Sequence, residues 1–331
     1  MGFLLEGVWR DDAPNTDAHG RFVRQASRYH NWVTPDGAPG PSGEGGFPAA
    51  AGRYHLYVSL ACPWAHRTLI FRKLKRLEDI ISVSVVDPIM GAEGWVFSDA
   101  PGTIPDTVEG RQRLSEIYLL ANPDYTGRVT VPVLWDKERR TIVSNESSEI
   151  IRMLNSAFAA FTADRTDYYP PALRGEIDAV NAEIYETVNN GVYRSGFAGT
   201  QEAYEEACRG LFKTLDKMEE RLSRQRYLVG NTLTEADWRF FTTLARFDAV
   251  YYVHFKCNLR RIADYPNLAN YLRDLYQVPG VAETVNMDHI KTHYYGSHRN
   301  LNPRGIVPIG PLLDFDAPHD RARFNRADAA E

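Results

Sequence analysis

The chain has 331 residues, of which 44% are hydrophobic and 24% charged, a balance typical of a folded globular protein large enough for two domains. A formal net charge of −5 and the lack of any block of Lys or Arg argue against general nucleic-acid binding. No apolar run approaches the roughly 18 residues that a membrane span needs.

The N-terminal segment, residues 1–50, is rich in Gly, Pro, Asp and Arg. Such a composition predicts an irregular arm rather than a run of helices or strands. Trp9, Phe22 and Trp32 are large apolar side chains within it, so we expect the arm to pack on the body of the protein.

A strand, a helix and a second strand follow the arm. Residues 54–60 and 80–86 have strand patterns, and 63–77 has the spacing of an amphipathic helix. This order predicts a right-handed βαβ unit with two parallel strands. The basic side chains of the helix are expected on its solvated face: Arg67, Arg72, Lys73, Lys75 and Arg76.

Residues 88–127 form an insertion rich in Gly and Pro, with a short helical stretch near 111–120. A connection this long and irregular is uncommon and is usually functional where it occurs. Residues 129–135 predict a third strand that is interrupted by Pro132, and a cis peptide bond after Val131 would reconcile the proline with that strand.

A fourth strand at 141–143 and a helix from 144–147 to about Asn155 complete the first domain. The order of these strands and helices is that of a thioredoxin-like α/β domain, which we assign to 51–160 with the insertion 88–127.

The composition changes to helix formers after Pro170 and Pro171, which predicts an all-α domain over 170–290. Residues 291–331 are expected to form a C-terminal extension, extended from about His293 onward. The predicted helices of the second domain are 171–190, 200–224, 234–252 and 266–277.

Cys62 lies at the predicted corner between the first strand and the first helix. Pro63 suits the first helical position, where a backbone N–H would have no partner. A thiol just before it lies at the positive end of the helix dipole, which favours the thiolate. Position 65 is Ala65, so no second cysteine completes a C-x-x-C pair. A buried structural cysteine is the equally weighted alternative from this corner alone.

Two further segments fit one ligand together with Cys62. Val131, before the proline, can present its backbone N–H and C=O to an extended peptide, and the helix start at Glu146 and Ser147 favours a carboxylate. Arg128 can pair with a second carboxylate. Glutathione has this set of groups, so these residues predict a glutathione site.

Neither the other two cysteines nor a metal site offers a second reactive centre. Cys208 and Cys257 have no helix-start context, so we expect them to be structural, and three cysteines make no disulfide framework. The compartment is therefore expected to be the reducing cytoplasm. Cys62 and His66 are one helical turn apart, but no second pair completes a tetrahedral set, so no metal is expected.

Several motifs resemble those of a known family. The helical second domain, Val-Pro at 131–132, Glu-Ser-Ser at 146–148 and Thr-Glu-Ala-Asp at 234–237 are similar to cytosolic glutathione transferases. Other motifs resemble the glutathionyl-hydroquinone reductases, the Xi class of that superfamily, over nearly the whole chain. These are Cys-Pro-Trp-Ala at 62–65, Gly94–Phe97, Asn190–Tyr193, Tyr251–Asn258 and Tyr294–Pro311.

The resemblance implies a role for each matching residue. Cys62 would be the nucleophile. Glutathione, the co-substrate, would be held by Trp95, Arg128, Val131, Glu146 and Ser147. The aromatic substrate would be held by Tyr193, Tyr252 and Tyr295. A homodimer is implied as well.

The sequence thus predicts an enzyme that reduces glutathionyl-hydroquinones to hydroquinones through a mixed disulfide between Cys62 and glutathione. Within enzymes, the alternative is an omega-type thioltransferase or dehydroascorbate reductase, which also uses one cysteine but needs no tyrosine cluster. A conjugating transferase is disfavoured, because a cysteine at the corner tends to form mixed disulfides. The alternative of another class is a non-catalytic assembly module with the transferase fold.

Overall fold

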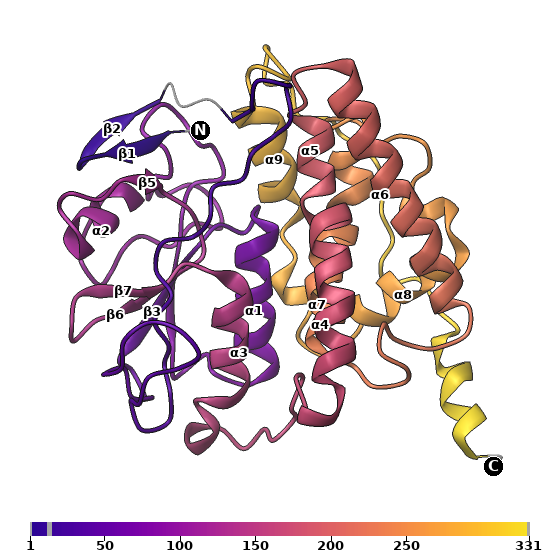
Figure 1. The fold of residues 1–331 in the computed structure, drawn as a ribbon, viewed down its shortest axis with the longest axis horizontal. Helices are drawn as coiled ribbons and strands as arrows, with labels where there is room; N and C mark the ends of the chain where they lie inside the picture. The colour runs from indigo at the N-terminus through magenta and orange to yellow at the C-terminus, as the bar shows by residue number, and fades with distance from the viewer. Residues whose placement is uncertain (1, 12–14, 330–331) are drawn as a thin grey trace.

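The computed structural model describes residues 2–11 and 15–329, which form two packed halves (Figure 1). One half contains the strands, and the other contains helices only. α1 (Pro63–Leu74) and α3 (Ser147–Ser156) lie between the central sheet and the helical half, where α1 contacts α7 (Glu235–Arg246). The seam between the halves is therefore formed by α1 on one side and α7 on the other.

The central sheet has the strand order β4-β3-β6-β7. β3 (Tyr54–Val58) pairs in parallel with β4 (Ser82–Val85) and antiparallel with β6 (Val133–Asp136), which pairs antiparallel with β7 (Thr141–Ser144). Every residue of β3 is buried, as expected for a central strand covered on both faces. The predicted βαβ unit and the thioredoxin-like domain are confirmed.

The third predicted strand, 129–135, begins later in the structure than predicted. β6 begins at Val133, so Pro132 precedes the strand instead of interrupting it. Because proline has no N–H to donate to a ladder, the pairing starts only after it. The Val131–Pro132 peptide bond is cis, as predicted. The helical stretch of the insertion is also confirmed, as α2 (Leu114–Ala121).

The N-terminal arm contains a hairpin that the sequence pattern did not predict. β1 (Phe3–Leu5) and β2 (Val8–Arg10) are joined by a two-residue turn, and β1 also pairs with β5 (Gly127–Arg128). Both turn residues, Glu6 and Gly7, have positive φ, the geometry of a tight hairpin turn. Strands this short carry too little alternation to be recognised, so the prediction of a wholly irregular arm was wrong here.

Among the described residues, the helical half contains six α-helices. Two of them end in π-helical turns. Tyr185–Asn189 follows the first helix of this half and Phe247–Tyr251 follows α7, where the sequence pattern predicted uninterrupted helices. Such turns often occur at functional sites. The helices are α4 (Arg174–Ile184), α5 (Gly191–Gly196), α6 (Gln201–Leu222), α7 (Glu235–Arg246), α8 (Pro266–Tyr276) and α9 (Met287–Ser297).

Helix α9 corrects the prediction of an extended tail from His293. The Asn286 side chain accepts a hydrogen bond from the N–H of His289 and caps this helix, which continues to Ser297. The predicted domain boundary at 290–291 therefore falls inside a helix, and the extended segment begins after it. Short 3₁₀ turns complete the described chain at Ala159–Phe161, Pro171–Leu173, Ile262–Asp264, Ala282–Thr284 and Arg321–Ala329.

None of the helices in the described part of the chain combines the length and the apolar character that crossing a bilayer requires.

Candidate active site

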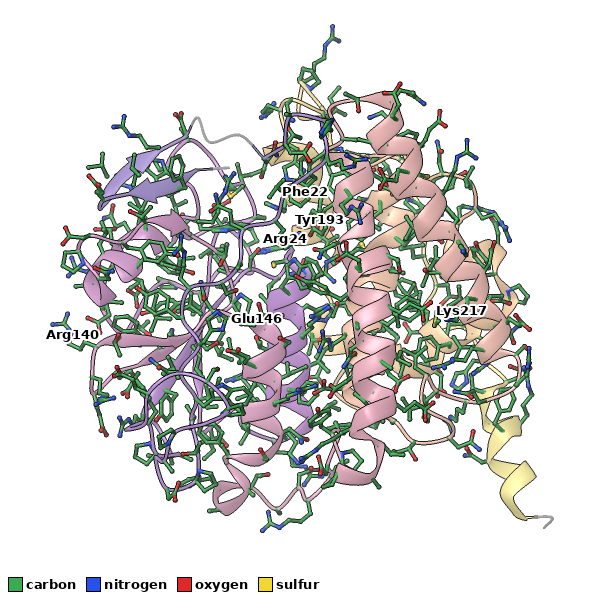
Figure 2. All side chains as sticks on the ribbon, in the orientation of Figure 1. Phe22, Arg24, Arg140, Glu146, Tyr193 and Lys217 are labelled. Carbon is green, nitrogen blue, oxygen red and sulfur yellow. The ribbon has the colours of Figure 1, made fainter. Side chains whose placement is uncertain are left out.

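Two adjoining pockets open at the seam between the halves, where Phe22, Arg24 and Tyr193 gather (Figure 2). One is bordered mainly by polar groups, and the other is largely aromatic. They share the walls formed by Arg24, Trp64, Arg128, Thr130 and Val131. A ligand with a polar body and an aromatic end can therefore span both pockets.

Cys62 lies in the wall of the aromatic pocket, at the corner that the sequence predicted. It is the N-cap residue of α1, with Pro63 at the first helical position. Its Sγ donates a hydrogen bond to the carbonyl of Val131 at 3.5 Å. The structure thus brings together Cys62 and the residue before the cis proline, which lie 69 positions apart in the sequence.

The thiol is less acidic in the structure than its place at a helix start suggested. Burial raises the pKa of Cys62, although the backbone N–H groups of Ala65 and Trp64 and the charges of Arg246 and Arg24 act to lower it. Burial disfavours the charged form because the low-dielectric surroundings solvate a thiolate poorly. In the ligand-free protein the resting group at neutral pH is therefore the thiol.

We predict that the alkylation rate of Cys62 by iodoacetamide rises with pH and still rises beyond about pH 8.5, the ordinary pKa of cysteine. The raised pKa leaves only a small thiolate fraction below that pH, and the thiolate is the form that reacts. Peptide mass mapping separates Cys62 from the buried Cys208 and Cys257. A plateau reached below about pH 7 would mean that the helix start outweighs burial.

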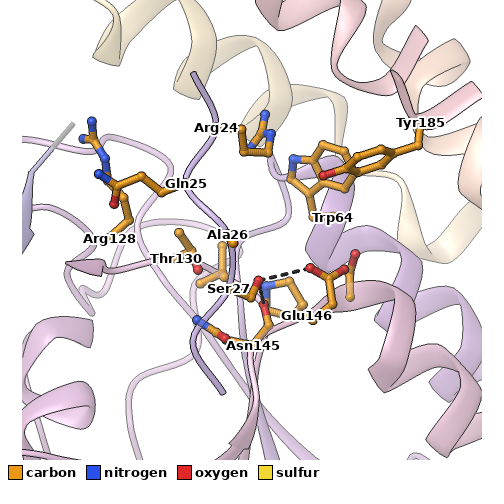
Figure 3. Close-up of a pocket in the computed structure, with 13 residues that line it drawn as sticks. Arg24, Gln25, Ala26, Ser27, Trp64, Arg128, Thr130, Asn145, Glu146 and Tyr185 are labelled. Atoms are coloured by element: carbon orange, nitrogen blue, oxygen red, sulfur yellow. Dashed lines mark hydrogen bonds between the residues drawn. The ribbon is translucent and has the colours of Figure 1, made fainter. Parts of the chain in front are cut away.

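The polar pocket offers about 580 Å³ of free space, part of which is open solvent (Figure 3). The Glu146 carboxylate lies in its wall and accepts from the N–H of Ser148 at 3.0 Å, the Ser148 hydroxyl at 2.8 Å and the Ser27 hydroxyl at 3.0 Å. Burial would raise the pKa of Glu146, but these hydrogen bonds and the charge of Arg67 hold it below the usual value. An ionised carboxylate therefore borders this pocket.

Ser147 is the first residue of α3 and lies in the same wall. Arg67 points toward it, with 3.4 Å from Nη1 to the Ser147 hydroxyl, and also donates to the side chain of Asn189 at 3.0 Å. Arg67 is 1% exposed, so its prediction on a solvated helix face was wrong. Burial lowers its pKa to about 9. The helix start and this guanidinium together make the corner electropositive.

The arm supplies residues that sequence reasoning missed. Ser27 bonds Glu146, and Arg24 donates to the Asn190 side chain at 2.6 Å. The Arg24 guanidinium also lies 4.8 Å from the ring centroids of both Trp64 and Tyr193. Apart from its aromatic residues, nothing in the arm's composition indicated a contact with the site, because these contacts join segments far apart in sequence.

The aromatic pocket offers about 790 Å³ of free space, part of which is open solvent. Trp95, from the insertion, lies in its wall and stacks on His293 of α9 with ring centroids 4.8 Å apart. Burial lowers the pKa of His293 to about 4, so this imidazole is neutral at physiological pH. The predicted residues Trp95, Arg128 and Val131 thus all border the pocket that contains Cys62.

Three tyrosine hydroxyls form a hydrogen-bonded chain beside the aromatic pocket. The Tyr294 hydroxyl lies 2.5 Å from that of Tyr193 and 3.0 Å from that of Tyr251. Burial raises the pKa of all three, and Cys62 raises that of Tyr193 further when it is ionised. The three groups are therefore neutral hydroxyls that can donate hydrogen bonds.

The predicted pocket residues Tyr252 and Tyr295 are not among the residues that line the two pockets. Tyr252 is only half-buried and lies outside both pockets, and the Tyr295 hydroxyl donates to the carbonyl of Ala249 at 3.1 Å. Successive helical residues point about 100° apart, so a slip of one position turns the side chain away from the site. Of the neighbouring tyrosines, Tyr294 lines the aromatic pocket. Tyr251 is fully buried and bonds the hydroxyl of Tyr294.

The described residues contain no group of three or more His, Cys, Asp or Glu side chains that could hold a metal ion. Cys208 and Cys257 are buried in the helical half and line neither pocket. Of the three cysteines, Cys62 alone lines one of these two pockets.

Comparison with known proteins gives matches to both halves. Models of the N-terminal and C-terminal domains of glutathione S-transferases match residues 61–157 and 201–274. Glutathionyl-hydroquinone reductase YqjG of Escherichia coli K12 is 60% identical over 97% of this chain and 98% of its own. Glutathionyl-hydroquinone reductase PcpF of Sphingobium chlorophenolicum is 55% identical over 94% and 96%.

Solved structures agree with these sequence matches. The glutathione-bound structure of Escherichia coli YqjG superposes with a TM-score of 0.90 at 58% identity, over 96% of this chain and 98% of that one. A Xi class glutathione transferase from Natrialba magadii gives 0.90 at 51% identity, over 98% and 97%.

Proposed function

Since the chain belongs to the glutathionyl-hydroquinone reductases, the Xi class of the glutathione transferase family, we propose that it reduces glutathionyl-hydroquinones to hydroquinones with glutathione as co-substrate. One observation carries the proposal. The thiol of Cys62 lies in a wall of the aromatic pocket, which shares Val131 with the polar pocket and has the hydroxyls of Tyr193 and Tyr294 at its border.

In the proposed complex the glutathionyl group occupies the polar pocket. The ionised carboxylate of Glu146 suits the γ-glutamyl amine, and the α3 start at Ser147 suits the γ-glutamyl carboxylate. Val131 offers its backbone to the cysteinyl unit. Arg128 and Trp95, which border the neighbouring pocket, complete the set near the sulfur and the glycyl end.

The first step is attack of the Cys62 thiolate on the glutathione sulfur of the conjugate. A sulfur–sulfur bond forms to Cys62, the bond from sulfur to the ring carbon breaks, and its electron pair stays on the ring. That carbon takes up a proton to give the hydroquinone. Tyr193, Tyr251 and Tyr294 can supply this proton or bond the phenolic oxygens, because they are neutral at physiological pH.

The second step resolves the mixed disulfide. A free glutathione thiolate attacks the glutathione sulfur bound to Cys62, releasing glutathione disulfide and the Cys62 thiolate. The conjugate is reduced and two glutathione units are oxidised to one disulfide. Ala65 occupies the position where a resolving cysteine of the protein would stand, which supports an external thiol in this step.

The proposal is tested by turnover of the wild-type protein with a glutathionyl-hydroquinone and glutathione. One hydroquinone and one glutathione disulfide are expected per conjugate consumed, with kcat/KM for the conjugate at least about tenfold above that for dehydroascorbate. A preference for dehydroascorbate would favour the omega-type alternative. Absence of any product would favour a non-catalytic module.

We propose further that the reaction takes place in the cytoplasm. All three cysteines are free thiols, which suits the reducing cytoplasm. A homodimer is proposed from the family resemblance. The reaction as written requires no metal ion.

A further inference from the structure

Arg246 is a fully buried arginine at the end of α7 that bonds the chain directly before Cys62. Its Nε donates to the carbonyl of Ala61 at 2.8 Å, and Nη2 donates to the carbonyl of Leu60 at 3.1 Å. An arginine from the helical half therefore holds the corner of the other half on which the reactive thiol is mounted.

The remaining donors of Arg246 also end on neutral groups. Nη1 donates to the carbonyl of Thr242 at 2.8 Å and lies 3.0 Å from Nδ1 of His66. Because a guanidinium can only donate, Nδ1 must accept, and the imidazole proton is on Nε2, which bonds the Thr284 hydroxyl at 2.8 Å. Burial, followed by the charge of Arg246, lowers the pKa of His66 well below its usual value.

The charge of Arg246 is therefore not neutralised by any carboxylate that it bonds in the described part of the chain. Arg53 and Arg152 differ, since Arg53 pairs with the buried Asp136 and Arg152 with the buried Glu235. The buried Arg67 and Arg321 resemble Arg246, because their bonds to described residues also end on neutral groups. An arginine stays protonated in proteins, and a buried charge without a counter-ion carries a large desolvation cost. Such a charge, bonded to the two residues that precede Cys62, indicates that the corner is arranged to receive a negative charge.

The positive charge of Arg246 acts on Cys62 and on two of the tyrosine hydroxyls that serve in the proposed reaction. The charge of Arg246 lowers the pKa of Cys62 against the larger rise caused by burial, and it acts in the same sense on Tyr251 and Tyr294. Arg24 acts similarly on Cys62 but is exposed to water, which screens its charge. The other titratable groups that face Cys62 are Arg128, His66, Tyr193, Tyr294, His293 and His298.

We propose that Arg246 is a positioning residue for Cys62, which it fixes through the two preceding carbonyls, and that its buried charge is the counter-ion of the Cys62 thiolate. Its use in turnover rests on the proposed function. The coupling between Arg246 and Cys62 exists in the free protein and does not depend on the substrate.

The test compares the alkylation rate of Cys62 by iodoacetamide, as a function of pH, in three variants. Arg246→Gln keeps hydrogen-bond donors without the charge, Arg246→Met removes both while filling the space, and Arg246→Lys keeps the charge. We expect alkylation at pH 8 to be at least about tenfold slower in the Gln and Met variants, with the pH profile displaced upward by about one unit. Arg246→Lys should stay close to wild type.

Arg321 provides a matched control. It is also fully buried and donates to the carbonyls of Leu222, Gln225 and Arg226, but it lines neither pocket. Arg321→Gln should therefore destabilise the protein without changing the alkylation profile of Cys62. Circular dichroism and thermal melting identify the folded variants.

Two results would overturn the proposal. One is a wild-type profile in a folded Arg246→Gln or Arg246→Met protein. The other is the same displacement in Arg246→Lys or Arg321→Gln, which would mark a general effect of destabilisation. Because no substrate is used, absence of hydroquinone turnover in the wild type would refute the proposed function and leave this test intact.

Discussion

Replacement of Cys62 by serine is expected to lower the turnover of a glutathionyl-hydroquinone by at least about 10³-fold, because the nucleophile of the reaction is lost. A serine hydroxyl is almost wholly un-ionised at neutral pH and cannot form a disulfide with glutathione. The polar pocket around Glu146 is unaltered, so the affinity for glutathione should change little. Steady-state release of hydroquinone and calorimetric titration with glutathione measure these two quantities.

Cys208→Ala is the matched control for this change. Cys208 is also a free thiol, but it is buried in α6 and lines neither pocket. Its removal should leave turnover within the range of the wild type once the variant is shown to be folded. Turnover above a tenth of the wild-type rate in Cys62→Ser would rule out Cys62 as the nucleophile.

A second large loss of activity is expected when Tyr294 is replaced by phenylalanine. Its hydroxyl bonds those of both Tyr193 and Tyr251, so Tyr294→Phe breaks the hydrogen-bonded chain at its middle and leaves two buried hydroxyls short of a partner. General acid catalysis by such a group contributes about 10²-fold or more. We expect kcat for the conjugate to fall by about 10²-fold, with a smaller change in KM.

The neighbouring tyrosines are controls of the same residue type. Tyr295→Phe loses only the bond to the carbonyl of Ala249, and Tyr252 lies outside both pockets. Both variants should retain kcat within about threefold of the wild type. A large loss of kcat in Tyr295→Phe or Tyr252→Phe, with Tyr294→Phe unaffected, would contradict this prediction. It would show that the reaction uses the hydroxyl of Tyr295 or Tyr252 instead.

The parts of the site that the sequence could predict are those with local signals. Cys62 and Pro63 mark a helix start, and Val131 precedes a proline that stands just before a strand. Glu146 is the N-cap residue of another helix, which its side chain caps by accepting a hydrogen bond. Each signal spans a few residues and fixes a backbone conformation. The strand order then places Cys62, Val131 and Glu146 at the same end of neighbouring strands.

The parts that could not be predicted depend on contacts between distant segments. Arg24 reaches Asn190, and Arg246 reaches Ala61, across separations of 166 and 185 positions. Arg67 has the pattern of an exposed basic residue and is buried only because the helical half covers α1. No local pattern distinguishes such arginines from those in solvent.

The register of the tyrosines depends on a different kind of feature. In each of the pairs Tyr251–Tyr252 and Tyr294–Tyr295, both residues have the same side chain, so composition cannot choose between them. The choice depends on the rotation of α9 and of the π-helical turn Phe247–Tyr251. A π-turn adds a residue to the turn and shifts the face that follows, which a pattern of regular helical spacing does not include.

The most direct measurement of the central claim is the intact mass of the protein after reaction with a glutathionyl-hydroquinone in the absence of free glutathione. We predict a gain of one glutathionyl group on Cys62, release of one hydroquinone per chain, and loss of the adduct when glutathione is added. Hydroquinone release that leaves Cys62 unmodified, or an adduct on Cys208 or Cys257 instead, would contradict the account.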